Sequence, residues 1–257
     1  MRIATWNVNS VQARLPYVLA WLGERQPDVV CLQELKTEGE SFPHQAFQAA
    51  GYQAHVHGQR QWNGVAVLCR QPGELRQLGL PGAEAAGSRL VTVEVAGWQV
   101  TSVYVPNGKA LDHPDYQRKL QWLERLADHL AASADFGREV VVAGDYNVTP
   151  SDLDTFDPDG LRGQIHHSAA ERAAIARLRD LGLRDLLRDK HADARAYSWW
   201  DYRAGSFHRN HGLRIDLLLG SASVAAAVDD VWVDRDWRKK RDELTPSDHA
   251  PVVVDLR

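Results

Sequence analysis

An acid and a histidine stand together near the end of the chain, directly before an apolar run. Asp248 and His249 precede residues 251–256, a β-branched sequence typical of a buried strand. A second carboxylate, Asp216, lies inside the apolar run 214–219, where an unpaired charge is costly to bury. Asp216 therefore needs a cationic or hydrogen-bonding partner, and His249 is the available candidate.

Further polar residues follow other predicted strands. Asn7 follows the first strand of the chain and Glu34 the second, while Asp145 and Asn147 follow a valine run. Because α/β sheets bind ligands at strand ends, we expect these side chains to share one site. Each also has an ordinary structural explanation, since Asn and Asp often cap turns and Glu34 could pair with Lys36.

These residue types are suited to phosphate chemistry. Oxygen ligands without a Cys/His cluster favour magnesium or manganese over zinc. Magnesium held by carboxylates points to a phosphate ester, whose hydrolysis needs a cation, a positioned water and help for the leaving group. We assign metal binding to Glu34, water activation to Asp145, phosphate contact to His249 oriented by Asp216, and hydrogen-bonding support to Asn147, Asn7 and Tyr104.

Hydrophobic periodicity predicts the elements that must position these residues. Helices are predicted at 12–26, 43–50, 112–132 and 169–181. Strands are predicted near 3–8, 28–34, 52–57, 64–70, 89–96, 98–105, 139–143, 196–200, 213–220, 228–233 and 251–256. Strand–helix–strand units at both ends favour an α/β fold whose sheets are covered by helices. No linker or repeat divides the sequence, so we expect a single domain over residues 1–257.

Composition limits the setting of the protein more than its function. The 257 residues carry a formal net charge of −4, which argues against a uniformly basic nucleic-acid coat but allows carboxylates to gather around a cation. Cys31 and Cys69 lie in apolar runs and are expected to be reduced core thiols. The sequence shows no signal peptide and no membrane-spanning run, so we expect a cytoplasmic protein.

Six short motifs, in order along nearly the whole chain, together resemble the exonuclease III family of abasic-site endonucleases. They are Trp6-Asn7-Val8-Asn9, Leu32-Gln33-Glu34-Leu35-Lys36, Tyr104-Val105-Pro106-Asn107-Gly108, Gly144-Asp145-Tyr146-Asn147, Arg214-Ile215-Asp216 and Ser247-Asp248-His249-Ala250-Pro251. The resemblance implies a four-layer α/β sandwich of the deoxyribonuclease-I type, in which two mixed sheets pack face to face with helices outside. It also implies a phosphodiesterase that uses Mg²⁺, with Mn²⁺ as a substitute, on double-stranded DNA.

Carried over by position, the resemblance makes Glu34 the principal metal ligand, with Asn7 and Asp248 close by. Asp145 would activate water with support from Asn147, His249 paired with Asp216 would contact the scissile phosphate, and Tyr104 would help at the phosphate or leaving group. An apolar pocket for a sugar without its base would be formed by Trp199, Leu213 and Ile215, within an aromatic segment that includes Trp200. Candidate backbone-phosphate contacts are Arg14, Lys36, Arg89, Arg203, Arg209 and Asn107. The basic run 237–241 is either a further contact or a solvated turn.

The expected function is incision of duplex DNA 5′ to abasic sites together with removal of 3′ nucleotides or blocking groups, by a monomer. Two alternatives remain open: a phosphodiesterase acting on a lipid head group, and a non-catalytic nucleic-acid-binding regulator on the same fold. The aromatic segment and the lack of a membrane-binding stretch favour DNA. The resemblance is weakest at residues 72–87 and 205–211, which leaves the balance between endonuclease and exonuclease action open.

Overall fold

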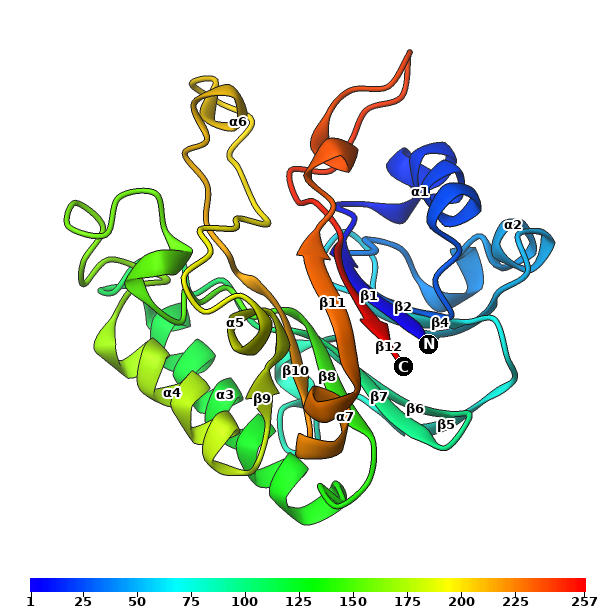
Figure 1. Ribbon diagram of the computed structural model, residues 1–257, viewed down its shortest axis with the longest axis horizontal. Coiled ribbons are helices and arrows are strands. Elements are labelled where there is room, and N and C mark those ends of the chain that lie inside the picture. The colour runs from blue at the N-terminus through cyan, green and yellow to red at the C-terminus, as the bar shows by residue number, and fades with distance from the viewer.

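Two six-stranded mixed sheets form the centre of the molecule, seen in a computed structural model that describes residues 1–257 (Figure 1). The first sheet contains, in spatial order, β11 (Val228–Val233), β12 (Val252–Leu256), β1 (Arg2–Asn7), β2 (Val29–Gln33), β4 (Val65–Cys69) and β3 (Gln53–His57). The second contains β5 (Gly73–Leu78), β6 (Leu90–Val95), β7 (Trp98–Tyr104), β8 (Val140–Asp145), β10 (Asp216–Gly220) and β9 (Arg184–Asp185).

Helices cover the outer face of each sheet. Figure 1 shows α1 (Val11–Arg25) and α2 (His44–Ala49) outside the first sheet, and α3 (Pro114–Ser133) and α4 (Ala169–Asp180) outside the second. Shorter helices are α5 (Leu186–Lys190), α6 (Ser206–Arg209) and α7 (Ala222–Ala227), and the 3₁₀ turns are η1 (Gly39–Ser41), η2 (Glu84–Ala86), η3 (Asp152–Asp154) and η4 (Arg235–Arg238). No helix has the length and apolar character to cross a membrane.

Three apolar layers hold these elements together. Successive residues of a strand face opposite sides of a sheet, so a strand buried on both faces contributes to two layers. In β1, Ile3 packs between the two sheets, whereas Ala4 and Trp6 pack under α1. A third layer lies between the second sheet and the helices α3 and α4. The predicted four-layer α/β sandwich is therefore confirmed.

The strand directions bring the predicted site residues to one edge of both sheets. β1 and β2 are parallel, which places Asn7 beside Gln33, the residue before Glu34. β7 and β8 are also parallel and place Tyr104 opposite Asp145. β10 runs antiparallel to β8 and begins with Asp216 opposite Asp145. The sheet register thus brings polar residues together from five strands of the two sheets.

Two sequence predictions differ from the structure. Residues 196–200 are not a strand, because Trp199 makes only isolated bridges to Leu213 and His249. β5 lies within the segment 72–87, for which no strand was predicted; it is an edge strand whose mostly exposed side chains lack an apolar alternation. Outside these segments, the long predicted helices and buried strands are present.

The cysteines are buried and unpaired, as expected. Both belong to the layer between the sheets. Burial raises the pKa of the Cys69 thiol to about 12. Both cysteines thus behave as small apolar core residues.

Gly144, the residue before Asp145, tests the β7–β8 contact. A Cβ atom there would lie 1.9 Å from the carbonyl oxygen of Val103, in the neighbouring strand, so Gly144→Ala cannot keep this strand spacing. We expect a loss of about 3 kcal/mol or more in the free energy of unfolding, measured by urea denaturation. Gly23→Ala is the matched control, because its Cβ would meet no atom within 4 Å in α1, and it is expected to stabilise by about 0.5–1 kcal/mol. Equal effects of the two substitutions would contradict the close packing.

Candidate active site

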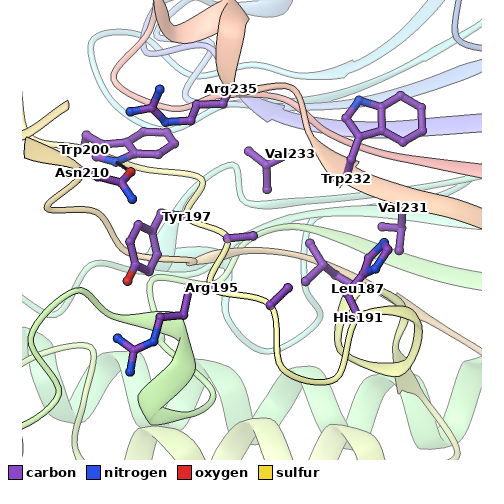
Figure 2. A pocket seen from close by; sticks show the side chains of 12 residues that line it. Leu187, His191, Arg195, Tyr197, Trp200, Asn210, Val231, Trp232, Val233 and Arg235 are labelled. Carbon is purple, nitrogen blue, oxygen red and sulfur yellow. Dashed lines mark hydrogen bonds between the residues drawn. The ribbon is translucent and has the colours of Figure 1, made fainter. Parts of the chain in front are cut away.

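A cavity of about 540 Å³ lies apart from the predicted catalytic and metal-binding residues, and of the predicted site residues only Trp200 lines it (Figure 2). It is lined mainly by apolar side chains of α5, β11 and the segment between α5 and α6, among them Leu187, Tyr197 and Trp232. No carboxylate lines it. The chemistry must therefore be sought at the polar edge of the sheets.

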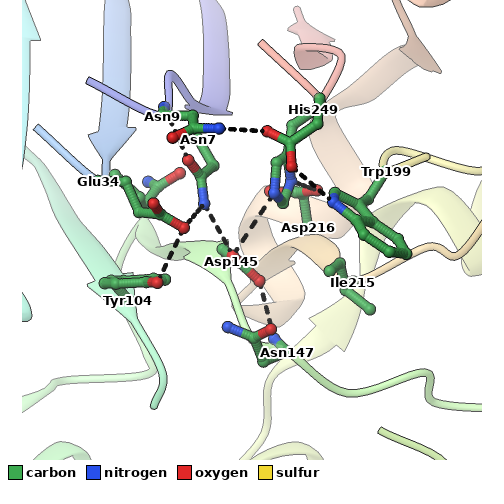
Figure 3. Close-up of polar contacts among 12 residues, drawn as sticks. Asn7, Asn9, Glu34, Tyr104, Asp145, Asn147, Trp199, Ile215, Asp216 and His249 are labelled. Carbon is green, nitrogen blue, oxygen red and sulfur yellow. Dashed lines mark hydrogen bonds and ion pairs between the residues drawn. The ribbon is translucent and has the colours of Figure 1, made fainter. Parts of the chain in front are cut away.

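Asn7 holds two carboxylates together at that edge (Figure 3). Its buried side-chain amide donates to Glu34 Oε1 at 2.9 Å and to Asp145 Oδ2 at 3.0 Å. Its Oδ1 accepts from the backbone N–H of Asn9 at 3.0 Å, and turning the amide over would place two donors face to face. The Tyr104 hydroxyl also donates to Glu34 Oε1, at 2.9 Å. Glu34 and Asp145 are therefore fixed side by side from different sheets.

His249 lies between two buried acids. Its Nδ1 is 2.8 Å from Asp216 Oδ2, and its Nε2 is 3.9 Å from Asp145 Oδ2. Ser198 donates to the same Asp216 oxygen at 2.6 Å. The partner that the buried Asp216 required is therefore His249, with Ser198 as a second donor.

This arrangement makes the imidazole a cation at neutral pH. Burial alone would lower the pKa of His249, but the carboxylates of Asp216, Asp145 and Asp248 outweigh it and raise that pKa to about 10. Burial and the charge of Asp216 raise the pKa of Asp145 to about 7, although His249 opposes them. The protonated ring donates from Nδ1 to Asp216 and presents its Nε2–H beside Asp145.

Asp248 is one step removed from this cluster. Asn9 donates to its Oδ1 at 2.9 Å and the Trp199 indole N–H to its Oδ2 at 3.0 Å. Burial would raise the pKa of Asp248, but His249 and these two donors outweigh it and lower the pKa. Lys36 Nζ joins Asn9 Oδ1, at 2.6 Å, to Glu34 Oε2, at 2.9 Å. Asp248 is thus ionised and linked to Glu34 through side chains.

The donor set fits a hard cation on the Glu34 side of the site. Glu34 offers an ionised carboxylate whose side chain is 19% exposed; burial would raise its pKa, but Asn7 and Lys36 outweigh this and lower it. Asn7 presents an N–H rather than an oxygen to this position, so in this structure it orients ligands and is not placed to be one. Asp145, Asp216 and His249 also form a close cluster, in which His249 Nδ1 is already bound to Asp216 Oδ2 at 2.8 Å.

Two asparagines line the loops beside Asp145. The Asn147 N–H donates to Asp145 Oδ1 at 2.9 Å, and its side-chain amide donates to the Val105 carbonyl at 3.0 Å. The exposed Asn107 donates to Asn147 Oδ1 at 3.2 Å. Asn147 has a φ of 50°, a left-handed conformation that Asn tolerates better than most residues. Its side chain is therefore held against the site by both loops.

The predicted apolar pocket residues lie together, with one exception. Bridges join Trp199 to Leu213 and to His249, which places the partly exposed indole and its apolar neighbour beside the imidazole. Ile215 lies close by (Figure 3). Trp200 was wrongly placed among the substrate contacts: its ring is fully buried against Tyr197 and packs edge-on with Phe207. Two adjacent tryptophans in the sequence do not show which of them faces the site, and only Trp199 does.

The predicted phosphate contacts differ in how free they are. Arg203 is 88% exposed and pairs with Asp201 at 2.7 Å, and Arg209 is exposed on α6. Arg14 donates to the Asn9 carbonyl at 2.5 Å. Arg89 stacks 4.7 Å from the Tyr104 ring and donates to two backbone carbonyls, so it braces Tyr104.

The basic run 237–241 is not one continuous patch. Trp237 is buried, and the Arg241 guanidinium stacks on its ring at 3.9 Å. Arg238 is buried against the Tyr202 ring, 4.8 Å away. Only Lys239 and Lys240 are largely exposed, so most of this run serves packing.

Sequence reasoning missed three residues that position the site. Asn9 links Lys36 to Asp248, and its place in the Trp6–Asn9 motif was an available signal. Ser198 binds Asp216, and Lys119 contacts the loop of Asn147 from inside α3. A serine in an aromatic segment and a lysine on an amphipathic helix carry no signal of this kind in one sequence.

The endonuclease/exonuclease/phosphatase family model matches residues 4–249. The chain belongs to this family. A relative, exodeoxyribonuclease III of Haemophilus influenzae, is 33% identical over the full length of both chains. An AP endonuclease from Archaeoglobus fulgidus superposes with a TM-score of 0.95 and 37% identity, over 100% of this chain and 99% of that one. A 3′ phosphatase from Neisseria, solved bound to a product DNA hairpin, superposes with a TM-score of 0.95 and 39% identity, over 100% of this chain and 99% of that one. The resemblance to the exonuclease III family is confirmed.

The protonation of His249 in this family member is open to a direct test. Its folded pKa of about 10 exceeds the unfolded value of about 6.5, so the stabilisation from this proton is present below pH 6.5 and is lost as pH rises through 10. We expect the melting temperature of the metal-free protein to fall over this range. In the Asp216→Asn variant we expect the melting temperature to fall less steeply with pH. We also expect NMR of the ring to show that His249 of this variant is neutral at pH 8. Asp230→Asn is the control, because it alters the exposed pair of Asp230 with His191. This variant is expected to keep the wild-type dependence of the melting temperature on pH.

Proposed function

We propose that the protein is a metal-dependent DNA-repair phosphodiesterase that incises duplex DNA 5′ to abasic sites and removes 3′ nucleotides or blocking groups. The observation that carries the proposal is the juxtaposition of the partly exposed Glu34 carboxylate with Asp145 and a protonated His249. The names of the related exonuclease, AP endonuclease and 3′ phosphatase support the same reaction class.

Asp145 and His249 would divide the work on the phosphodiester. A carboxylate whose pKa is near 7 is suited to accept a proton from an attacking water at neutral pH. The imidazolium of His249 would donate from Nε2 to a phosphate oxygen, while Asp216 keeps the ring charged and oriented. A Mg²⁺ ion bound at Glu34, when present, would neutralise charge on the phosphate. Asp248 would act on this ion indirectly, through the Asn9 link.

Tyr104 is suited to donate a hydrogen bond rather than a proton. Burial and the carboxylates of Glu34 and Asp145 raise its pKa well above the ordinary phenol value, so it stays neutral. Its hydroxyl donates to Glu34, and Arg89 supports its ring. Tyr104 would therefore orient Glu34 through its single hydroxyl hydrogen, and would contact the phosphate as a neutral donor only if that hydrogen turns away from Glu34.

Abasic DNA fits the apolar surface beside His249. A nucleotide without a base is unstacked at lower cost than an intact one, and the partly exposed Trp199, with the buried Leu213 and Ile215 beside it, would offer an apolar surface to its sugar. Exposed cations such as Arg203 and Arg209 would contact the flanking backbone. We further propose that the enzyme acts as a monomer; a cytoplasmic location stays a prediction.

Cleavage of a defined duplex tests this function. The purified protein is incubated with a duplex carrying one synthetic abasic site, and separately with duplexes ending in a 3′ phosphate or a recessed 3′ hydroxyl, in Mg²⁺, Mn²⁺ or EDTA. We expect metal-dependent cleavage of DNA and no release of a phospholipid head group. Cleavage of the lipid alone would favour the lipid phosphodiesterase, and DNA binding without any cleavage would favour the regulator.

Asp145→Asn separates chemistry from binding. The amide is nearly isosteric but cannot accept the proton of the attacking water, so we expect kcat to fall on the order of 10²-fold or more. The affinity for DNA, measured in EDTA by fluorescence anisotropy, is expected to change little. Asp128→Asn, at an exposed carboxylate of α3, serves as the control and is expected to keep full activity. A near-normal rate for Asp145→Asn would remove this residue from its proposed role.

A further inference from the structure

Lys119 is the buried lysine of this chain. It belongs to α3, and its side chain and that of its ion-pair partner Glu171, in the first turn of α4, are both fully buried. The ammonium makes three contacts: with Glu171 Oε1, with the Asn147 carbonyl at 2.6 Å, and with the Asn107 carbonyl at 3.2 Å. A single buried cation therefore ties two helices to the two loops that carry the site asparagines.

The loops pack closely around this contact. A Cβ atom on Gly108 would lie 3.0 Å from Lys119 Cδ, so the loop that contains Asn107 and Gly108 packs against the aliphatic part of the lysine side chain. The Asn147 carbonyl also faces His166 Nδ1 at 2.5 Å. Glu171 in turn accepts from the backbone N–H groups of His166 and Ser168, each at 3.0 Å. The main chain at Asn107, at Asn147 and at residues 166–168 is thus anchored to the Lys119–Glu171 ion pair.

Stability alone does not account for an ion pair at this position. Replacing a buried ion pair by apolar residues of similar volume is often neutral or stabilising, because both charges must give up water. An apolar pair would fill the space between α3 and α4, but it could not donate to the carbonyls of Asn107 and Asn147. What the lysine adds is therefore the placement of these two backbone segments.

We propose that Lys119 is a positioning residue, whose ammonium fixes the main chain of Asn107 and Asn147 so that their side chains meet the substrate in one geometry. The inference rests on the proposed function for its kinetic consequence. It acts through backbone carbonyls and requires no contact between Lys119 and DNA. A displacement of about 1 Å in such groups can cost on the order of 10²-fold in rate.

Two variants that differ only in the ammonium test the proposal. Glu171→Gln keeps an acceptor oxygen for Lys119, whereas Lys119→Met in the Glu171→Gln background removes the donor without leaving an unpaired buried carboxylate. We expect the double variant to have a kcat lower than that of Glu171→Gln by on the order of 10²-fold, with KM and the DNA affinity in EDTA nearly unchanged. Equal kcat values in the two variants would overturn the proposal, as would a loss of rate that follows only the melting temperature.

A second measurement does not depend on catalysis. Backbone hydrogen exchange at residues 105–109 and 146–149 is expected to be faster in the double variant than in Glu171→Gln, while exchange in the central strands stays the same. Unchanged exchange in both loops would overturn the proposal whatever the activity. If the wild-type protein cleaves none of the DNA substrates, the proposed function fails, and hydrogen exchange alone decides the placement of the loops by Lys119.

Discussion

The close approach of Asp145 and Asp216 in a buried space is the constraint on which the site depends. They face each other across the β8–β10 ladder, both essentially without solvent contact. Two carboxylates so placed are stable only if charge or hydrogen bonds compensate them. His249 compensates both from one side, and the amide of Asn7 donates to Asp145 from the other. The rest of the edge extends this pattern of compensation outward toward Glu34 and Asp248.

The polar strand ends made much of this site predictable from the sequence. Asn7, Glu34 and Asp145 follow apolar strands, and parallel neighbours end at one edge of a sheet, so their proximity follows from the fold class. The pairing of Asp216 with His249 followed from the cost of burying a carboxylate in an apolar run. Both inferences use patterns that are visible in the sequence, namely polar residues after apolar strands and a carboxylate within an apolar run.

Other features depend on tertiary contacts that no local pattern encodes. Lys119 occupies a helix where a lysine ordinarily faces solvent, and only the docking of α4 and two loops buries it. Trp199 and Trp200 differ in exposure because the ring of Trp200 packs against Tyr197 and Phe207, whereas the indole of Trp199 lies near His249. Arg89 was expected to meet phosphate, yet the stacking on Tyr104 uses its guanidinium. In each case the sequence shows the type of the residue but does not show which residues it contacts in the folded protein.

Glu34 and Asp145 differ in exposure, and this difference suits them to the different tasks proposed for them. Asn7 fixes Glu34 and Asp145 at hydrogen-bonding distance from one nitrogen, but the Glu34 side chain is 19% exposed and that of Asp145 is 2% exposed. A cation arriving from solvent therefore meets Glu34 first, on the side where Lys36 now supplies positive charge. Asp145 is buried, and burial raises its pKa toward neutrality, which suits it to accept a proton. One bridging amide thus keeps the two carboxylates adjacent while their different exposure suits Glu34 to the proposed metal binding and Asp145 to the proposed role of base.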